Sequence, residues 1–468
     1  MTTLALATCL GCQGRLASGA GDVGSPSADN PDAGAPTTAL WAFQGHTTGQ
    51  GDVGSVVANE AGLVAVTGSY DPGHADFGMG PTPDVGSFFT MLDASGKVQW
   101  TQFTSATASF GRVTFDPDGN VLTAGELQTT ASFGGTTLIA PANTYAGFLS
   151  RWDRAGHLLW AKVITMATPV RDVYLAAELS SVAVAQDGTI YVAGGFDASE
   201  VDLGGGPFPT GASAANSWTW NAFIAAYSHT GGFLWAHIIP STGDVSANRI
   251  VALPTGPVVS GTFKETVDLG SGVQHAKANI DTYLLALDPS GRPLWSHTFA
   301  GVSFYINWTA LARDRAGVVF AGGFQGPVDF GTGVLSSTTL TDPDVAVARY
   351  GPDGTATWTA RVGRVGYDDV SDVSVDPEGD VFVVGRSAAD AHTELEDFVA
   401  AKLSPTGAIL WTWYVPDGPP HLGAMGRAVS WGGGGLFVGG DFDQGVVLAP
   451  DISLRTVSGD FFVARITP

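Results

Sequence analysis

The sequence predicts an all-β chain whose short strands form seven four-stranded sheets around a ring. The main observation is a recurring segment in which an apolar run meets a turn closing on Gly, with a Trp four residues later. The copies are LDASGKVQW (92–100), RWDRAGHLLW (151–160), AYSHTGGFLW (226–235), ALDPSGRPLW (286–295), RYGPDGTATW (349–358) and KLSPTGAILW (402–411). The composition agrees, because 64 Gly, 44% hydrophobic and only 14% charged residues are typical of many short turns between apolar strands.

The spacing of the repeat sets the size of each sheet. Its tryptophans are separated by 59, 60, 75, 60, 63 and 53 residues, at Trp41, Trp100, Trp160, Trp235, Trp295, Trp358 and Trp411. Between two of them the same features return: an apolar strand with a polar turn such as VTFDPDGN (113–120), a Gly-containing strand such as VAVTGSY (64–70), and a third apolar strand such as FFTML (88–92). With the Trp strand this makes four strands of about five residues and no helical periodicity.

Counting the strands predicts how the ring closes. The first three strand types occur seven times, whereas the Trp strand follows its own turn six times and stands alone once, at 40–45. The chain ends just after a third-type strand, at 461–466. We expect 40–45 to pair with 461–466, because this leaves no unpaired sheet edges at the junction. The predicted fold is a seven-bladed β-propeller with four antiparallel strands per blade.

The N-terminal region divides into two short segments before the repeats. Residues 1–12 form an apolar leader that contains both cysteines, Cys9 and Cys12, and 13–38 form a tether rich in Gly, Ala, Ser and Pro that we expect to be disordered. Residues 39–468 form one propeller domain. No run of the sequence approaches the roughly 18–20 apolar residues of a membrane span.

Two resemblances bear on export and family. Cys12, preceded by Leu10 and Gly11, resembles the lipid-modified cysteine of bacterial lipoproteins; a start codon placed too late would explain why no Lys or Arg precedes it. Another export signal or a chance match are the alternatives. Residues 40–468 resemble the SBBP family of bacterial β-propeller repeats, which implies a secreted or surface protein.

The Asp-x-x-Gly-x-x-x-Trp element (Asp93, Gly96 and Trp100 in the first copy) is also similar to the blade motif of quinoprotein dehydrogenases and of outer-membrane assembly propellers. The adjacent cysteine pair of the quinoproteins is absent, and no cofactor is predicted. A pattern repeated around a ring cannot mark a single active site. The seven repeat tryptophans are therefore expected to be structural.

Strand alternation predicts that short, uniform turns lie on one face of the disc and that long, variable connections lie on the other. Variable loops on a rigid scaffold commonly carry binding sites. On that face, exposed aromatic side chains could stack on sugar rings or anchor a protein. The candidates are Trp218, Trp220, Tyr305 and Trp308; the alternative for Trp218 and Trp220 is that they start a strand and pack between blades.

Acidic turns raise the question of calcium. Asp116 with Asp118, and Asp376 with Asp380, lie in segments that fit ordinary type I turns, which need no metal. Tyr367, Asp368 and Asp369, followed by Asp372, form the densest acidic loop expected on the ligand face, and they are predicted ligand-binding residues. No metal site is predicted.

The net charge of −23 makes nucleic acids and anionic lipid headgroups poor partners. No G-x-S-x-G turn supports hydrolase chemistry. We therefore expect a non-catalytic binding scaffold, exported to the bacterial cell envelope, monomeric, and directed at a protein or glycan. It would be held by a lipid anchor at the outer membrane or cell surface, or else be periplasmic or extracellular. The alternative is a propeller enzyme acting on glycans, with carboxylates on the long-loop face.

Overall fold

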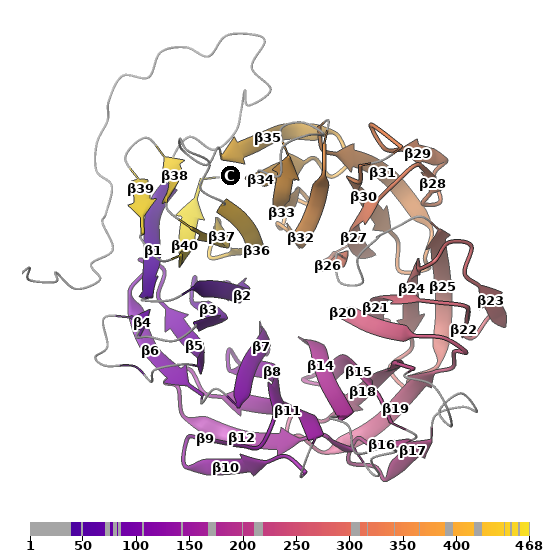
Figure 1. The fold of residues 1–468 in the computed structure, drawn as a ribbon, viewed down its shortest axis with the longest axis horizontal. Coiled ribbons are helices and arrows are strands. Elements are labelled where there is room, and N and C mark those ends of the chain that lie inside the picture. The colour runs from indigo at the N-terminus through magenta and orange to yellow at the C-terminus, as the bar shows by residue number, and fades with distance from the viewer. Residues whose placement is uncertain are drawn as a thin grey trace, which may run out of the picture.

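The computed structural model contains strands and turns, and its described residues include no helix. Those residues are 39–47, 50–70, 75–77, 82, 86–104, 107–141, 144–166, 175–198, 200–209, 219–300, 309–315, 317–340, 342–364, 366–388, 396–415, 424–443, 445–449, 452–456 and 459–467. Among them there is accordingly no helix that is long and apolar enough to cross a membrane. The all-β, propeller-like architecture predicted from the repeats is confirmed, with the sheets set radially around a central axis (Figure 1).

The described strands form seven groups of four hydrogen-bonded, antiparallel strands, in which the first strand is innermost and the last is outermost (Figure 1). The first three are β2 (Gly51–Ala58), β3 (Val64–Tyr70), β5 (Gly86–Leu92) and β6 (Val98–Phe103); β7 (Ala108–Phe115), β8 (Val121–Leu127), β11 (Thr144–Trp152) and β12 (Leu158–Val163); and β14 (Leu175–Val184), β15 (Ile190–Phe196), β18 (Asn221–Tyr227) and β19 (Phe233–Ile239). The next two are β20 (Val245–Leu253), β21 (Gly256–Phe263), β24 (Asp281–Leu287) and β25 (Pro293–Ala300); and β26 (Thr309–Asp314), β27 (Gly317–Phe324), β30 (Asp344–Tyr350) and β31 (Ala356–Val362). The last two are β32 (Asp368–Val375), β33 (Val381–Ala388), β34 (Glu396–Leu403) and β35 (Ile409–Val415); and β36 (Ala424–Gly432), β37 (Gly435–Phe442), β40 (Asp460–Ile466) and β1 (Ala39–Thr47). We refer to these groups as the first to the seventh sheet.

The N-terminal and C-terminal strands are hydrogen-bonded to each other, as the strand count predicted. β1 pairs antiparallel with β40 over six residue pairs, from Ala39 opposite Ile466 to Gly45 opposite Phe461. The first strand of each sheet contacts the first strand of the next, and β36 contacts β2. A short parallel pairing of β11 with β14 also joins the second and third sheets.

Five of the connections from the second to the third strand contain a regular hairpin, where the sequence predicted long, variable loops. In five sheets this connection folds into a short hairpin on the outside of the disc. The strands are β9 (Thr130–Phe133) with β10 (Thr136–Ile139), β16 (Glu200–Asp202) with β17 (Pro207–Pro209), β22 (Thr266–Asp268) with β23 (Val273–His275), β28 (Pro327–Asp329) with β29 (Val334–Ser336), and β38 (Gly445–Ala449) with β39 (Ile452–Arg455). β13 (Thr165–Met166) pairs with β16, and β4 (Ala75–Asp76) pairs with β1. Leu203, Leu269 and Phe330 lie in three of these hairpins and are buried.

The repeat tryptophans fasten each sheet to the next. The indole Nε1 of six of them donates a hydrogen bond to a backbone carbonyl in the turn between the third and fourth strands of the following sheet. The Gly of that turn lies against the indole ring, so that a Cβ on Gly96 would lie 2.6 Å from Trp41. The bonds run from Trp41 to Ala94 (3.0 Å), Trp100 to Arg154 (3.0 Å), Trp160 to His229 (3.2 Å), Trp235 to Pro289 (2.8 Å), Trp295 to Pro352 (2.9 Å) and Trp358 to Pro405 (3.0 Å).

The hydrophobic core is divided into layers between neighbouring sheets. The layer between the seventh and first sheets contains Trp41 and Phe43 of β1, with Phe88 stacked on Phe461 at a centroid distance of 4.7 Å. Near the end of β1, His46 Nδ1 lies 3.0 Å from Asp460 Oδ2 of β40. β1 therefore contributes buried apolar side chains to the interface between the seventh and first sheets, and it also forms hydrogen bonds with the edge of β40.

We expect a chain that lacks residues 1–47 to lose more than about 5 kcal/mol of unfolding free energy, because the buried Trp41 and Phe43 are removed and the edge of β40 is exposed. Urea unfolding followed by tryptophan fluorescence measures the loss. The matched control lacks residues 1–38 and keeps β1. Equal stability of the two truncated chains would contradict the role assigned to β1.

Candidate functional site

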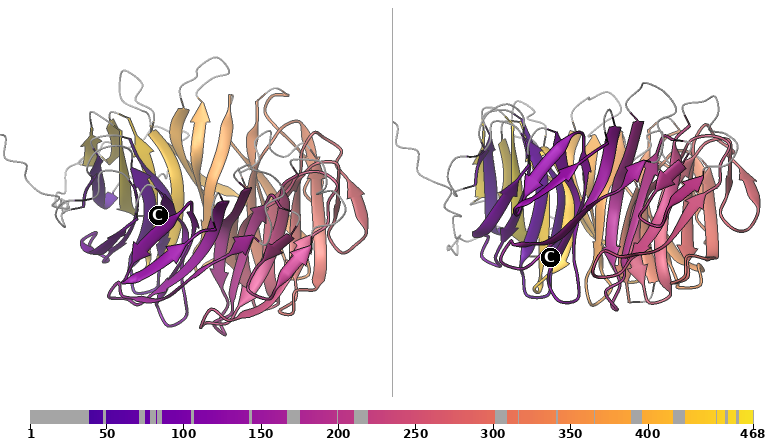
Figure 2. Two further views of the ribbon diagram at one scale, coloured as in Figure 1. Left: turned by 60° about the horizontal axis from the view of Figure 1, so that its bottom comes forward. Right: turned by 90° about the horizontal axis from the view of Figure 1, so that it is seen from below.

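The two faces of the disc differ in how they are built (Figure 2). On one, the turn face, Asp–Gly turns join first to second and third to fourth strands, as in the bond from Gly96 N to Asp93 O. On the other, the loop face, the first and third strands begin and the longer connections lie. The two larger hollows between described residues are on the loop face.

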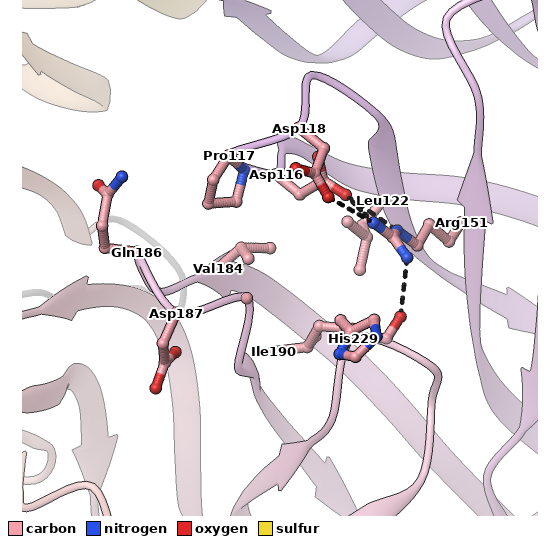
Figure 3. Close-up of a pocket in the computed structure, with 11 residues that line it drawn as sticks. Asp116, Pro117, Asp118, Leu122, Arg151, Val184, Gln186, Asp187, Ile190 and His229 are labelled. Carbon is pink, nitrogen blue, oxygen red and sulfur yellow. Dashed lines mark hydrogen bonds and ion pairs between the residues drawn. The ribbon is translucent and has the colours of Figure 1, made fainter.

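A smaller hollow of about 230 Å³ lies on the turn face between the second and third sheets (Figure 3). Arg151 points into it, but its Nε and Nη2 donate to Asp116 Oδ2 at 2.9 and 2.5 Å and its Nη1 donates to His229 O at 3.0 Å. Arg349 of the fifth sheet makes the corresponding contacts with Asp314 of the same sheet and with Pro405 O of the sixth sheet. The arrangement is therefore a repeated joint between sheets, and its guanidinium donors are already engaged.

Two adjoining hollows of about 390 and 460 Å³ lie on the loop face between the third and fourth sheets. They share Asp244 and Lys264, whose side chains form a 2.8 Å ion pair between them. We call the two hollows together the 3–4 groove. Glu265, which lines the second hollow, is the non-glycine residue with a positive φ (57°) among those described.

Trp220 is a predicted binding residue, and its indole lines the first hollow of the 3–4 groove. It precedes β18, and its partly exposed ring lies over Gly195, where a Cβ would come within 2.1 Å of the indole Nε1. Its backbone is fixed from both sides, because Trp220 N donates to Asp244 Oδ1 at 3.1 Å and Val245 N donates to Trp220 O at 2.9 Å. Gly195 thus makes room for a ring that is held in place and still faces the hollow.

Two carboxyl groups meet at the inner edge of the same hollow. Glu178 of β14 lines it, and its side chain is hydrogen-bonded to Glu126 of β8. Burial and the charge of Glu126 raise the pKa of Glu178 to about 7, and burial also raises the pKa of Glu126. Burial and the neighbouring carboxylate thus disfavour the charged form of Glu178.

These groups belong to a repeated polar position that sequence analysis missed. At one register position near the loop-face end of the first and second strands, the cross-strand pair is polar in several sheets. Examples are Asp52 opposite Ser69, Ser109 opposite Glu126, Ser246 opposite Thr262, and Asp369 opposite Arg386. A polar residue recurring at one register position of apolar strands is the signal that could have identified the site.

The other predicted ligand residues lie elsewhere. Tyr367, Asp368 and Asp369 are between the fifth and sixth sheets, and β32 begins at Asp368, so this segment is a strand and not the loop expected. Asp368 and Asp369 are buried, and Asp369 pairs with Arg386. Cys12, Trp218, Tyr305 and Trp308 lie outside the described residues.

The acidic turns have partners within the protein. Asp116 binds Arg151, and Asp380 Oδ2 lies 2.9 Å from Lys402 Nζ. Within the described part of the chain, no group of three or more His, Cys, Asp or Glu side chains is arranged to hold a metal ion.

Comparison with known proteins gives no family. No protein-family model matches the sequence, and no characterised protein sequence matches it. The structure is similar to Sqt1 from Chaetomium thermophilum (11% identity, 90% of this chain and 97% of that chain covered, TM-score 0.42). It is also similar to a variant of NanB sialidase from Streptococcus pneumoniae (12%, 94% and 71%, TM-score 0.39) and to a Bacteroides caccae protein of unknown function (11%, 70% and 89%, TM-score 0.36). At these scores the matches carry no information about activity.

The raised pKa of Glu178 predicts that the stability of the folded chain depends on pH. Because its folded-state pKa is raised to about 7 from 4.5, the native state loses stability as the pH rises from about 4.5 to about 7. Glu178→Gln should remove this loss, so that the variant gains roughly 1–3 kcal/mol over the natural chain between pH 5 and pH 8. Urea denaturation at the two pH values measures it. Glu60→Gln, at an exposed turn, is the control, and an equal gain there would contradict the assignment.

Proposed function

We propose that this chain is an exported, non-catalytic binding scaffold of the bacterial cell envelope that binds a glycan in the 3–4 groove. The observation that carries the proposal is the fixed, partly exposed indole of Trp220 beside two adjoining hollows. An aromatic ring held over an open hollow offers a flat apolar surface on which a sugar ring can stack.

The scaffold is a closed seven-bladed β-propeller in this proposal, of the SBBP type that the repeat resembles. Three facts support closure: β1 pairs with β40, β36 contacts β2, and Trp41 donates to Ala94 O across the junction. In such a ring the seventh blade takes its outer strand from the N-terminus. A closed ring is a rigid support on which one groove can be specialised without altering the others.

The lining of the groove favours a neutral, hydroxyl-rich ligand. Ser246, Thr262 and the carboxylate of Asp197 lie around the hollow with Trp220, and they are hydrogen-bonding groups suited to sugar hydroxyls. Lys264 is the cation among the lining residues, and it is paired with Asp244. An anionic ligand would therefore meet no unpaired positive charge here and would also face a chain of net charge −23.

A glycan-cleaving enzyme is the second candidate, because the raised pKa of Glu178 would suit a general acid. However, glycosidases place their two carboxyl groups about 5 Å or about 6.5–9.5 Å apart, on opposite sides of the bond that is cleaved. Glu126 and Glu178 are hydrogen-bonded to each other, which leaves no room for a sugar between them. Binding without cleavage is therefore the better-supported function.

The groove proposal predicts that Trp220→Ala lowers the affinity for a glycan selected from an array by tenfold or more, because the stacking surface is lost. Isothermal calorimetry of the full chain with that glycan measures the change. Trp220→Phe should retain part of the affinity, since it keeps an aromatic face. His229→Ala alters the hollow on the turn face and is the control; equal losses in both alanine variants, or none in either, would refute the groove. Release of reducing sugar during the titration would favour the enzyme.

We further propose that the chain is lipid-anchored through Cys12 and is monomeric. Cys12→Ser should move the protein from the membrane fraction to the soluble fraction of a bacterial host, because no other anchor is proposed. Fractionation followed by immunoblotting measures this. Membrane association that survives the substitution unchanged would exclude the lipid anchor and leave groove binding untouched.

A further inference from the structure

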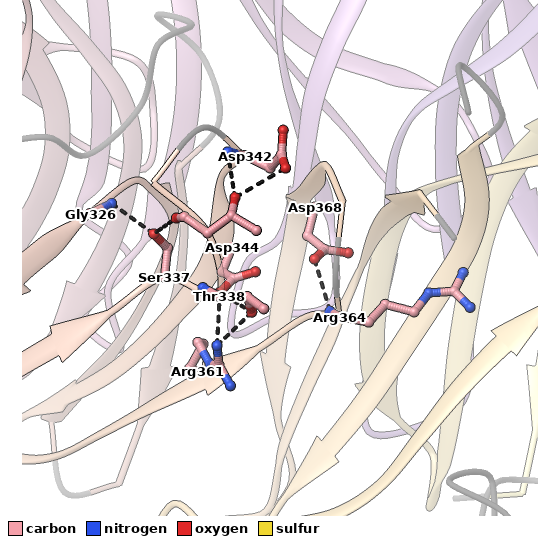
Figure 4. A network of polar contacts seen from close by, with 9 residues as sticks. Gly326, Ser337, Thr338, Asp342, Asp344, Arg361, Arg364 and Asp368 are labelled. Atoms are coloured by element: carbon pink, nitrogen blue, oxygen red, sulfur yellow. Dashed lines mark hydrogen bonds and ion pairs between the residues drawn. The ribbon is translucent and has the colours of Figure 1, made fainter. Parts of the chain in front are cut away.

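A pair of buried carboxylates lies between the fifth and sixth sheets, away from the 3–4 groove (Figure 4). Asp344 begins β30 and is 0% exposed, and Asp368 begins β32 and is 1% exposed. Asp368 N donates to Pro343 O at 2.9 Å, which holds the starts of the two strands together. Burying two acids side by side is costly unless something compensates their charge.

This pair departs from the repeat at a position that is otherwise apolar. In five other sheets, the first-strand residue at the register position of Asp368 has no ionisable side chain: Gly51, Ala108, Ala177, Val245 and Ala424. Opposite each of them, the second strand has a large apolar or aromatic side chain: Tyr70, Leu127, Phe196, Phe263 and Phe442. Opposite Asp368 this residue is Ser387, which is fully buried. In the sixth sheet, the carboxylate of Asp368 and the hydroxyl of Ser387 therefore occupy the place of the apolar cross-strand pair found in the other five sheets.

The two carboxylates face one point. A Cβ placed on Gly363 would lie 2.5 Å from Asp368 Oδ2 and 3.0 Å from Asp344 Oδ1. Asp344 Oδ2 accepts from Arg361 Nη1 at 3.2 Å, and Asp368 Oδ2 accepts from Arg364 N at 3.0 Å. The Oδ1 atoms of both residues are buried and accept no hydrogen bond. Asp344 Oδ2 also accepts from Thr338 N and Thr338 Oγ1, and a hydrogen bond from Ser387 lowers the pKa of Asp368 against the effect of burial. The two Oδ1 atoms are the oxygens left without a partner.

The nearby arginines do not neutralise this pair fully. Arg361 is shared with Thr338 Oγ1. The Arg364 side chain points away from Asp368 (Figure 4); its Nη2 lies 2.5 Å from Asp397 Oδ2, and its guanidinium lies 3.9 Å from the ring centroid of Tyr414. Burial, followed by the charge of Asp344, raises the pKa of Asp368 to about 7. The site therefore has a strong demand for positive charge.

We propose that Asp344, through its Oδ1, and the carboxylate of Asp368 together bind a hard divalent cation, calcium or magnesium. Oxygen ligands are those that both ions prefer, and magnesium in particular is commonly held by one or two carboxylates with water completing its shell. Two protein carboxylates agree with the absence of a larger acidic group among the described residues. The ion would bridge the fifth and sixth sheets at the place where the other sheets have apolar side chains.

Calorimetric titration of the metal-free full chain at pH 8 with calcium chloride, and separately with magnesium chloride, tests the site. We expect one ion bound with a Kd in the range of about 10⁻⁴–10⁻³ M, and a higher Tm when it is bound. Asp368→Asn should weaken binding at least tenfold, because it removes a charge and keeps the size of the side chain. The control is Asp460→Asn. Asp460 is at the position in the seventh sheet that corresponds to Asp344, but the neighbouring first strand begins there with Gly51, whose N donates to Gly459 O, so the affinity of this variant should be unchanged.

The outcomes are separable. Saturable binding of either ion that Asp368→Asn weakens and Asp460→Asn does not supports the proposal, and the titration that saturates identifies the ion. No saturable binding at pH 8, or equal binding by the natural chain and Asp368→Asn, overturns it. If Asp368→Asn unfolds, Ser387→Ala replaces it, since it leaves both carboxylates in place and should retain binding; loss of binding there without loss of folding would also overturn the proposal.

Discussion

The contact between each repeat Trp and the turn of the next sheet is the interaction on which the structure depends. The first sheet buries both of its faces, one against the seventh sheet and one against the second, but apolar contact alone does not fix the angle or register between two sheets. The indole Nε1 bond to a turn carbonyl supplies direction, and the Gly of that turn lets the backbone reach the ring. Because Trp41 makes this contact across the junction of the termini, the first sheet is fixed in the same way as the second.

Contacts that recur in several sheets are structural and do not mark a binding site. The Arg151 and Arg349 joints on the turn face recur in separate sheets with corresponding partners, so they serve the fold. The 3–4 groove and the Asp344–Asp368 pair are places where one sheet departs from the others. In the first, Gly195 makes room for the ring of Trp220; in the second, Asp368 and Ser387 replace apolar residues in a buried layer. Such departures cost stability locally, which is why they point to binding.

Two ionisable groups whose pKa is raised to about 7 lie on the loop face, Glu178 and Asp368. In each case burial disfavours the charged form and a second carboxylate lies close by.

The sequence by itself determined the strand repeat and the pairing of residues 40–45 with 461–466, because these follow from local periodicity and from counting strands. Its choice of Trp220 as a binding residue stays a prediction, and the position of the indole depends on Gly195 of another strand and on Asp244. Only the tertiary structure decided which carboxylates meet. Asp344 and Asp368 are 24 residues apart in the chain, and Glu126 and Glu178 belong to different sheets. Their closeness, burial and pKa values depend on how neighbouring sheets are set side by side, which no periodicity within one strand records.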